Sequence, residues 1–184
     1  MLPSNTNAMR RRIIAVVGAA ECTPSELQWQ LAYTLGEQLV LAGYRVLTGG
    51  LGGVMEAALA GAHIAVSYAE GDTLAILPGF SPESANSYAD LVIATGIDAH
   101  MNALVANSDA VIAIGGGAGT LCEIAMAWER NRPVLVYHKV DGSSAHVMEL
   151  HKAADCHAQL YPVATAQQAV GTLSQLWKEA DAST

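Results

Sequence analysis

The chain has 184 residues, of which 52% are hydrophobic and only 14% charged, and its formal net charge is −8. This composition excludes a disordered chain, and the length predicts one domain with a full hydrophobic core. The acidic balance argues against nucleic-acid binding, which needs clustered lysines and arginines, because the only basic cluster is Arg10-Arg11-Arg12.

Taken in chain order, the pattern of apolar residues and turn residues predicts alternating strands and helices. Residues 1–9 are interpreted as a flexible leader and residues 10–184 as one domain. Strands are expected at 13–17, 44–48, 74–77, 91–94, 110–114, 134–137 and 162–164, and helices at 25–42, 54–69, 100–107, 120–130, 143–154 and 165–180. Continuously apolar strands that alternate with helices predict a doubly wound, Rossmann-like α/β fold, in which helices cover both faces of a parallel sheet.

Cysteine usage and hydropathy indicate a cytoplasmic protein. Cys22, Cys122 and Cys156 are an odd number of cysteines without paired spacing, which fits a reducing compartment. No segment approaches the length of a transmembrane helix, so no membrane partner is expected. The low charged fraction indicates surface that is buried between copies of the chain, and we expect a homo-oligomer.

The most informative stretch runs from Val111 to Glu123 and reads VIAIGGGAGTLCE. An apolar strand ends at Ile114, a glycine-rich turn follows, and Thr120 opens a helical pattern. Such a turn lets bare backbone approach an anion, supplies free N–H groups and adds the positive end of the helix dipole. The sequence therefore predicts a phosphate-binding loop that consists of Gly115, Gly116, Gly117, Ala118, Gly119 and Thr120.

A second glycine loop, Gly49-Gly-Leu-Gly-Gly53, follows another predicted strand. Its spacing does not match the dinucleotide fingerprint G-x-G-x-x-G, and no Lys-Ser/Thr pair follows it as in a Walker A loop. The alternative to a ligand site is a sharp turn. Because the carboxyl ends of parallel strands meet at one edge of a sheet, we expect both loops and the loop Gly18–Thr23 to form one crevice.

The predicted crevice lacks basic side chains, because the chain has no lysine or arginine between Arg45 and Arg130. A phosphate there is held by amides and hydroxyls, and Thr48 and Thr120 are the candidate hydroxyl donors.

The sequence allows more than one role for several charged and polar residues. Glu56 and Glu123 lie in the first turns of their helices, where a carboxylate either contacts a ribose or base or only caps the helix dipole. His100 and Asn102 are expected to face the crevice opposite Glu123, with an ordinary surface position as the alternative for His100. No metal site is predicted, since the nearby residues His146, His151, Cys156 and His157 do not form a standard zinc pattern.

Two motifs in order make the chain recognisable. Val17-Gly18 is followed by T-G-G-x-G-G-V-M-E-A-A at 48–58 and by S-D-A-x-I-A-x-G-G-G-x-G-T-x-x-E at 108–123. These residues resemble the SLOG/LOG superfamily, whose members are often labelled "lysine decarboxylase-like". The resemblance covers residues 13 to about 137 and implies a Rossmann-like nucleotide-binding domain over 10–184.

The resemblance implies one of two activities. Cytokinin-activating phosphoribohydrolases cleave the N-glycosidic bond of a nucleoside 5′-monophosphate, and they carry P-G-G-x-G-T-x-x-E and an upstream arginine. Molybdenum cofactor carrier proteins are homo-oligomers that bind a phosphorylated pterin without changing it, and they tend to read G-G-G-x-G-T-x-x-E. Here Gly115 replaces the proline, His100 stands at the arginine position, and Asn102-Ala103-Leu104 looks like the carrier branch.

The sequence is therefore interpreted as a carrier-like binding protein, a dimer or tetramer, for a phosphorylated heterocycle such as the molybdenum cofactor or a nucleotide. No cofactor for catalysis is expected. The first alternative is a phosphoribohydrolase with Glu123 as its catalytic residue, although loss of one preorganised donor costs about 10²–10³ in rate unless a partner subunit supplies it. The second alternative is a nucleotide-sensing module without turnover. Ligand contacts are expected from Gly18, Ala19, Glu21, Thr48, Gly49, Gly50, Gly52, Gly53, Met55, Glu56, His100, Asn102, residues 115–120 and Glu123.

Overall fold

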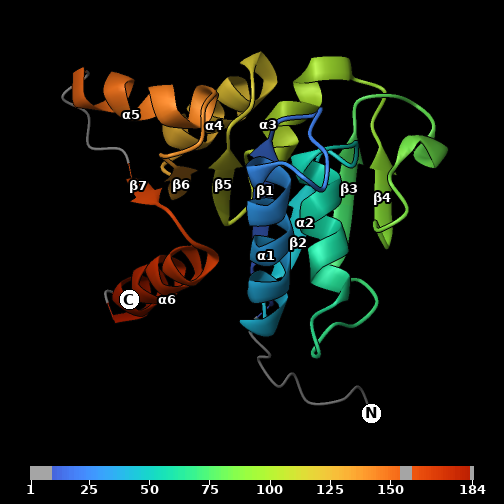
Figure 1. The fold of residues 1–184 in the computed structure, drawn as a ribbon, viewed down its shortest axis with the longest axis horizontal. Coiled ribbons are helices and arrows are strands. Elements are labelled where there is room, and N and C mark those ends of the chain that lie inside the picture. The colour runs from blue at the N-terminus through green and yellow to red at the C-terminus, as the bar shows by residue number, and fades with distance from the viewer. Residues whose placement is uncertain (1–9, 154–158, 183–184) are drawn as a thin grey trace, which may run out of the picture.

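Every predicted strand joins one parallel sheet with seven strands in the order β4-β3-β2-β1-β5-β6-β7 (Figure 1). The computed structural model describes residues 10–153 and 159–182, so the predicted leader at 1–9 lies outside the described residues. The strands are β1 Ile13–Gly18, β2 Arg45–Thr48, β3 Thr73–Leu77, β4 Leu91–Ala94, β5 Ala110–Ile114, β6 Val134–Tyr137 and β7 Leu160–Val163.

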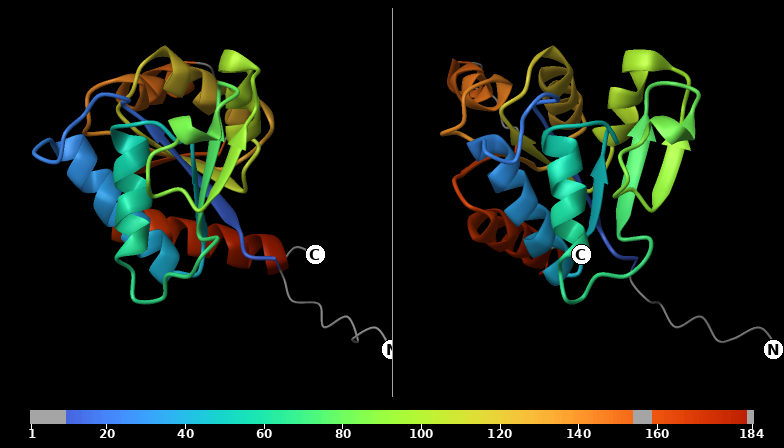
Figure 2. Two further views of the ribbon diagram at one scale, coloured as in Figure 1. Left: turned by 90° about the vertical axis from the view of Figure 1, so that its right-hand side faces the viewer. Right: turned by 45° about the vertical axis from the view of Figure 1, so that its right-hand side comes forward.

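Helices cover both faces of the sheet, which confirms the predicted doubly wound α/β fold (Figures 1 and 2). On β1, Ile14 and Val16 point to one face and Ala15 and Val17 to the other, as strand geometry requires. One face packs against α1 Leu27–Leu41, α2 Val54–His63 and α6 Ala166–Ala182, and the other against α3 Asn102–Val105, α4 Ala118–Glu129 and α5 Ser143–Ala153. The short 3-10 helices η1 Pro82–Ser84 and η2 Asp98–Met101 lie in connections.

The strand order reverses at β1, which pairs in parallel with β2 on one side and with β5 on the other. The chain therefore leaves β1 and β5 in opposite directions. At such a switch point the loops diverge at the carboxyl ends of the strands and leave a crevice. None of the helices in the described residues is long and apolar enough to cross a membrane.

The largest difference from the predicted elements is the helix expected at 54–69, which ends at His63. Beyond it the chain turns: the N–H of Tyr68 bonds to the carbonyl of Ala65 at 2.9 Å, and the N–H of Ala69 bonds to the Asp72 carboxylate at 3.1 Å. The helix must end early because β3 begins at residue 73 on the same edge of the sheet. The helix expected at 100–107 is instead η2 followed by the short α3.

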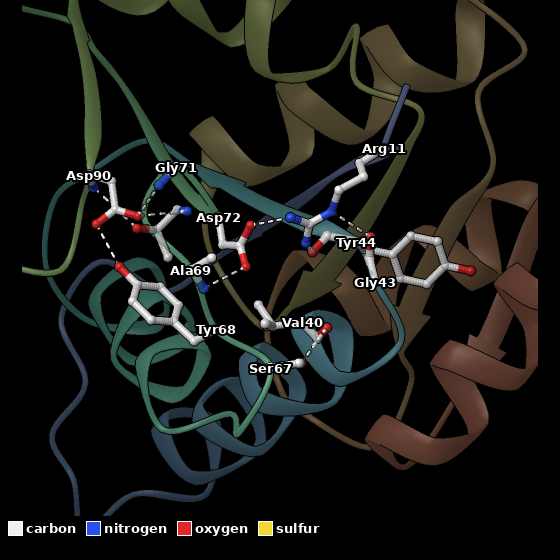
Figure 3. A network of polar contacts seen from close by, with 11 residues as sticks. Arg11, Val40, Gly43, Tyr44, Ser67, Tyr68, Ala69, Gly71, Asp72 and Asp90 are labelled. Carbon is white, nitrogen blue, oxygen red and sulfur yellow. Dashed lines mark hydrogen bonds and ion pairs between the residues drawn. The ribbon is translucent and has the colours of Figure 1, made fainter. Parts of the chain in front are cut away.

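Polar contacts hold this turn at the amino edge of the sheet (Figure 3). Asp72 is 1% exposed and forms an ion pair with Arg11, which precedes β1. The hydroxyl of Tyr68 donates to Asp90 at 2.6 Å, and Asp90 also accepts the N–H of Gly71 at 2.8 Å. These contacts join the start of β1, the turn after α2 and the start of β4, at the edge opposite the crevice.

Candidate functional site

A cavity of about 470 Å³ opens at the carboxyl ends of β1, β2, β3 and β5, where the switch point places the crevice. Among the residues that the structure describes, no lysine, arginine or histidine lines it. Its wall is formed by Gly18, Ala20, Gly49, Leu51, Met55, Pro78, Asp98, Ala99, Met101, Asn102, Gly117, Gly119, Thr120 and Glu123.

The loop between β5 and α4 is the part of the wall best suited to an anion. Gly115 and Gly116 adopt φ values of +61° and +86°, which other residues rarely tolerate, and Gly117 is the N-cap of α4. Gly117, Gly119 and Thr120 face the cavity, while the two preceding glycines make the turn that brings them there. The first N–H groups of α4 lack partners within the helix and form the positive end of its dipole.

The start of α5 fixes this loop from behind. Ser143 donates its N–H to the carbonyl of Gly116 and its hydroxyl to the carbonyl of Gly117, both at 2.8 Å. The hydroxyl of Ser144, which is fully buried, accepts the N–H of Gly115 at 2.8 Å. Because the carbonyls of the turn are bonded to α5, the polar groups left for the cavity are mainly N–H donors.

The second glycine loop contributes fewer groups to the wall than the sequence predicts. Thr48 is fully buried, and its hydroxyl oxygen accepts the N–H of Gly50 at 3.0 Å, which closes the turn. Gly53 has a φ of +64°, and a Cβ there would lie 2.3 Å from the carbonyl oxygen of Ala19. These glycines therefore let the loop pack against the loop after β1. The cavity residues of this segment are Gly49, Leu51 and Met55.

Glu123 is the buried acidic group of the cavity, with 8% of its surface exposed. It forms no hydrogen bond or ion pair with the described residues, and burial raises its pKa to about 8. The carboxyl group is consequently neutral at pH 7 in the free protein. In that form it donates a hydrogen bond and does not repel a phosphate.

Comparison with known proteins shows the family of this chain. The model of the SLOG cluster4 family matches residues 11–170. The chain belongs to this family. An uncharacterized protein of Archaeoglobus fulgidus is 39% identical over 127 residues, which are 68% of this chain and 80% of that protein.

Two solved structures place this SLOG protein close to the molybdenum cofactor carrier branch, as its motifs suggest. The molybdenum cofactor binding protein of the phototrophic bacterium Rippkaea orientalis superposes with a TM-score of 0.77 at 29% identity. The Moco carrier protein of Chlamydomonas reinhardtii gives a TM-score of 0.76 at 29% identity. Each comparison covers 92% of this chain and 99% of the other.

Several residues expected at the site of this SLOG protein lie outside the cavity wall. His100 is exposed, and its Nδ1 lies 3.2 Å from the carbonyl oxygen of Ile97. Asn102, two residues further on, does line the cavity. The other expected residues that do not line it are Ala19, Glu21, Thr48, Gly50, Gly52, Gly53, Glu56, Gly115, Gly116 and Ala118.

Sequence analysis missed one whole side of the cavity. Pro78 follows β3 directly, so the rule that loops after parallel strands form the crevice would have found it. Asp98, Ala99 and Met101 come from η2, which folds back over the strand ends. Asp98 has a φ of +48°, and no pattern in the surrounding sequence predicts this conformation. Ala20 and Leu51 also line the cavity; they were not named as contacts, although the loops that contain them were predicted to form the crevice.

The arginines of this SLOG protein lie at the amino edge of the sheet, away from the cavity. They precede or begin strands, or end α4, which runs back from the cavity. The guanidiniums therefore cannot reach a ligand bound in the cavity of the same chain. These residues are Arg10, Arg11, Arg12, Arg45, Arg130 and Arg132.

The residues considered as metal ligands give no site in the described part of the chain, where no group of three or more histidine, cysteine or acidic side chains is suitably placed. His146 bonds instead to the carbonyl of Gly142 at 2.9 Å. His151, Cys156 and His157 lie outside the residues described in full.

Proposed function

We propose that the protein binds a phosphorylated heterocycle without chemical turnover, as a carrier of the molybdenum cofactor. The observation that carries the proposal is the cavity wall itself, which combines the N-terminus of α4 with a buried carboxyl group and no basic side chain. The two solved structures named above, a molybdenum cofactor binding protein and a Moco carrier protein, support the same class of ligand.

The phosphate belongs at the start of α4, beside Gly117, Gly119 and Thr120. The amides at this helix start bind a phosphate there by hydrogen bonds and the helix dipole, without a charged side chain. A volume of about 470 Å³ lies within the range of roughly 300–1,000 Å³ found for small-molecule sites. The heterocycle then lies toward the apolar side of the wall, which includes Met55, Pro78 and Met101.

A neutral Glu123 suits binding of a polar ring. Its proton can bond to a ring nitrogen or carbonyl oxygen of the ligand, while the second oxygen accepts from a ring N–H. A phosphate dianion nearby raises the pKa of this carboxyl further, because two negative charges oppose each other. The bound complex therefore favours the neutral form that donates the hydrogen bond.

One observation favours phosphoribohydrolase activity as the second candidate. A carboxylic acid with a pKa of about 8 is still protonated at neutral pH, and it could transfer a proton to a departing base. Against this, cleavage builds positive charge on the sugar, which a neutral Glu123 does not stabilise, and the cavity offers no cation to hold the phosphate. Holding the ligand is therefore the better-supported function.

Two measurements decide between these functions. Pure protein is incubated with AMP and with cytokinin nucleoside monophosphates, and free base is measured. Release that is lost in Glu123→Gln would contradict the carrier proposal. In parallel, protein purified from cells that make the molybdenum cofactor is examined by native mass spectrometry for bound pterin. A nucleotide in its place, with no base release, would instead indicate a sensing module.

The phosphate position is tested at Gly117. A Cβ there has no neighbour within 4 Å, and an N-cap position favours Asp and Asn equally, so both variants should fold. Gly117→Asp adds a negative charge where we place the phosphate, and binding should be lost. Gly117→Asn has the same size without the charge and should bind more tightly than Gly117→Asp. Equal affinities of the two variants would contradict the placement.

A further inference from the structure

A second cavity, of about 400 Å³, lies at the amino edge of the sheet, at the opposite end of the strands from the ligand cavity. Its wall includes residues at the starts of four strands: Arg12 before β1, Asp109 before β5, Arg132 before β6 and Gln159 before β7. These parallel strands are neighbours in the sheet, so their starts lie side by side. The last turns of α6 pass the start of β1 and add Trp177 to the wall (Figure 2). We call this space the amino-edge cavity.

Arg132 brings an unpaired positive charge to the amino-edge cavity. Helix α4 ends where Asn131 adopts a φ of +53°, which turns the chain and places Arg132 two residues before β6. The guanidinium forms no ion pair with the described residues, and its Nη2 donates only a long hydrogen bond, of 3.4 Å, to the side-chain oxygen of Asn107. Its Nε is buried without a hydrogen-bond partner among the described residues. A buried N–H group without an acceptor is rare and costs free energy.

Arg12 brings a second guanidinium, which is held in place by its flat face. Its central carbon lies 4.2 Å from the centroid of the Trp177 ring. Stacking of this kind fixes the plane of the guanidinium and leaves its N–H edges free for an anion. The ion pair of Arg12 with Asp181 has a nitrogen–oxygen distance of 3.7 Å, and Asp181 is 61% exposed, so solvent weakens it. The Trp177 Nε1 is also buried without a partner among the described residues.

The acidic groups of the amino-edge cavity do not cancel these two charges. Asp109 accepts two hydrogen bonds from Arg10 and one from the N–H of Ile13, so its charge is already compensated. Glu179 is exposed and accepts a hydrogen bond from Gln175 at 3.0 Å. The carboxyl end of α6 adds about half a negative charge, which is less than the charge of two guanidiniums. The cavity therefore favours an anion.

We propose that the amino-edge cavity binds a small molecule by a phosphate group, which Arg12 and Arg132 hold together. A carboxylate has two oxygens and one charge and is matched by one guanidinium, whereas a phosphate group offers more oxygens and up to two charges to a pair. Its oxygens would also supply the acceptors that the buried N–H groups of Arg132 and Trp177 lack. A volume of about 400 Å³ falls in the range of small-molecule sites and leaves room for the rest of the ligand beside Tyr161.

This second site is independent of the proposed function. No described residue lines both cavities, and the two hold a phosphate by different means, one with helix amides and the other with arginine side chains. A test therefore needs a signal from the amino-edge cavity alone. The indole N–H of Trp177 supplies that signal, because each of the three tryptophans of the chain gives its own indole peak in an NMR spectrum of the ¹⁵N-labelled full chain.

The first experiment replaces sodium chloride by sodium phosphate at constant ionic strength and follows the indole peaks, with Trp177→Phe to assign the peak. We expect a saturable shift of the Trp177 peak and no shift for Trp29, which stacks on Tyr33 in α1. A Trp177 peak that does not move, or a shift that does not saturate at tens of millimolar phosphate, would overturn the proposal.

The second experiment repeats the titration on arginine variants. Arg132→Gln and Arg12→Gln should each raise the dissociation constant for phosphate at least about tenfold, since each loses a charge-assisted hydrogen bond. Arg130→Gln is the matched control, because this exposed arginine lies two residues from Arg132 and does not line the cavity. Two arginine positions guard against a folding defect in one variant. Unchanged affinity in both would overturn the site.

The third experiment separates the two cavities and tests the class of ligand. Gly117→Asp, which should block phosphate at the ligand cavity, should leave the Trp177 response unchanged; loss of that response would place the phosphate in the ligand cavity and overturn the second site. Ribose 5-phosphate should bind at least about threefold more tightly than inorganic phosphate, because its sugar contacts the rest of the wall. Equal affinities would contradict a phosphorylated small molecule as the ligand.

Discussion

The hydroxyl of Thr120 donates a hydrogen bond to the carbonyl oxygen of Gly18 at 3.2 Å, and so joins the loop after β5 to the loop after β1. Thr120 is 4% exposed and lies in the first turn of α4. The bond spans the switch point of the sheet, where neighbouring loops otherwise diverge. Its hydroxyl proton is therefore used inside the protein, and the hydroxyl oxygen stays free to accept.

Thr120→Val should lower stability, because it replaces the hydroxyl by a methyl group of similar shape and leaves the Gly18 carbonyl without this donor. We expect a loss of about 1 kcal/mol in the free energy of unfolding, measured with urea. Thr120→Ser keeps the hydroxyl and is the control. If the valine and serine variants are equally stable, the hydrogen bond does not tie the two loops.

Gly116→Ala should destabilise the protein by about 1–3 kcal/mol. The φ of Gly116 is +86°, and a Cβ there would lie 2.2 Å from the hydroxyl oxygen of Thr120. The comparison is Gly119→Ala in the same helix start, where a Cβ has no neighbour within 4 Å. Thermal unfolding should show a lower midpoint for Gly116→Ala and an unchanged or higher one for Gly119→Ala. Equal midpoints of the two variants would contradict the positive φ of Gly116 and its close approach to Thr120.

The fold and the glycine turn between β5 and α4 could be predicted because their signals are local. An apolar run that ends at Ile114, followed by glycines and a helical pattern, specifies strand, turn and helix within a few residues. The rest of the cavity depends on contacts between distant segments. Asp98 reaches the wall only because η2 folds over β3, and Gly53 serves packing because Ala19 approaches it. The exposure of Leu91 and Ile93 was also hidden, since four apolar residues at 91–94 look the same in the sequence whether a helix covers them or not.

Arg10→Gln should weaken the fold at neutral pH. Asp109 is 7% exposed and accepts two hydrogen bonds from Arg10, at 2.7 and 2.6 Å, and one from the N–H of Ile13 at 2.8 Å. Burial alone would raise the pKa of Asp109, but these hydrogen bonds outweigh burial and hold the pKa below 3.8. Because Arg10 is 70% exposed, solvent screens the pair, and we expect a loss of about 1 kcal/mol.

The pH dependence of this pair has a definite sign. A carboxyl group whose pKa is lowered by folding contributes stability above its unfolded pKa of about 3.9 and loses it as the pH falls through the folded value. The difference in the free energy of unfolding between wild type and Arg10→Gln should therefore be largest near pH 7 and shrink below about pH 4. Arg130→Gln, at an exposed arginine whose guanidinium donates to the carbonyl of Met126, is the control and should change little. If this difference in the free energy of unfolding is constant from pH 7 to pH 3, the ionised carboxylate of Asp109 does not stabilise the fold through Arg10.

Glu123→Gln should stabilise the protein above neutral pH. Burial raises the pKa of Glu123 from 4.5 to about 8, so the folded state keeps a proton that the unfolded state loses across this range. Below about pH 4.5 both states are protonated and Glu123 has no such effect. As the pH rises to about 8, wild type loses stability by at most about 5 kcal/mol, at 1.36 kcal/mol per pKa unit. A glutamine side chain cannot ionise, so the variant avoids this loss.

Urea unfolding at pH 4, 6 and 8.5 would measure this difference in the free energy of unfolding. We expect Glu123→Gln and wild type to be nearly equal at pH 4 and the variant to be more stable by about 2–4 kcal/mol at pH 8.5, since partial relaxation around the charged carboxylate reduces the full value. Glu129→Gln, at an exposed position at the end of the same helix, is the control. An advantage of Glu123→Gln that does not change with pH would mean that the carboxyl is already ionised in the folded protein. The hydrogen-bond donor that we assign to the ligand site would then be absent.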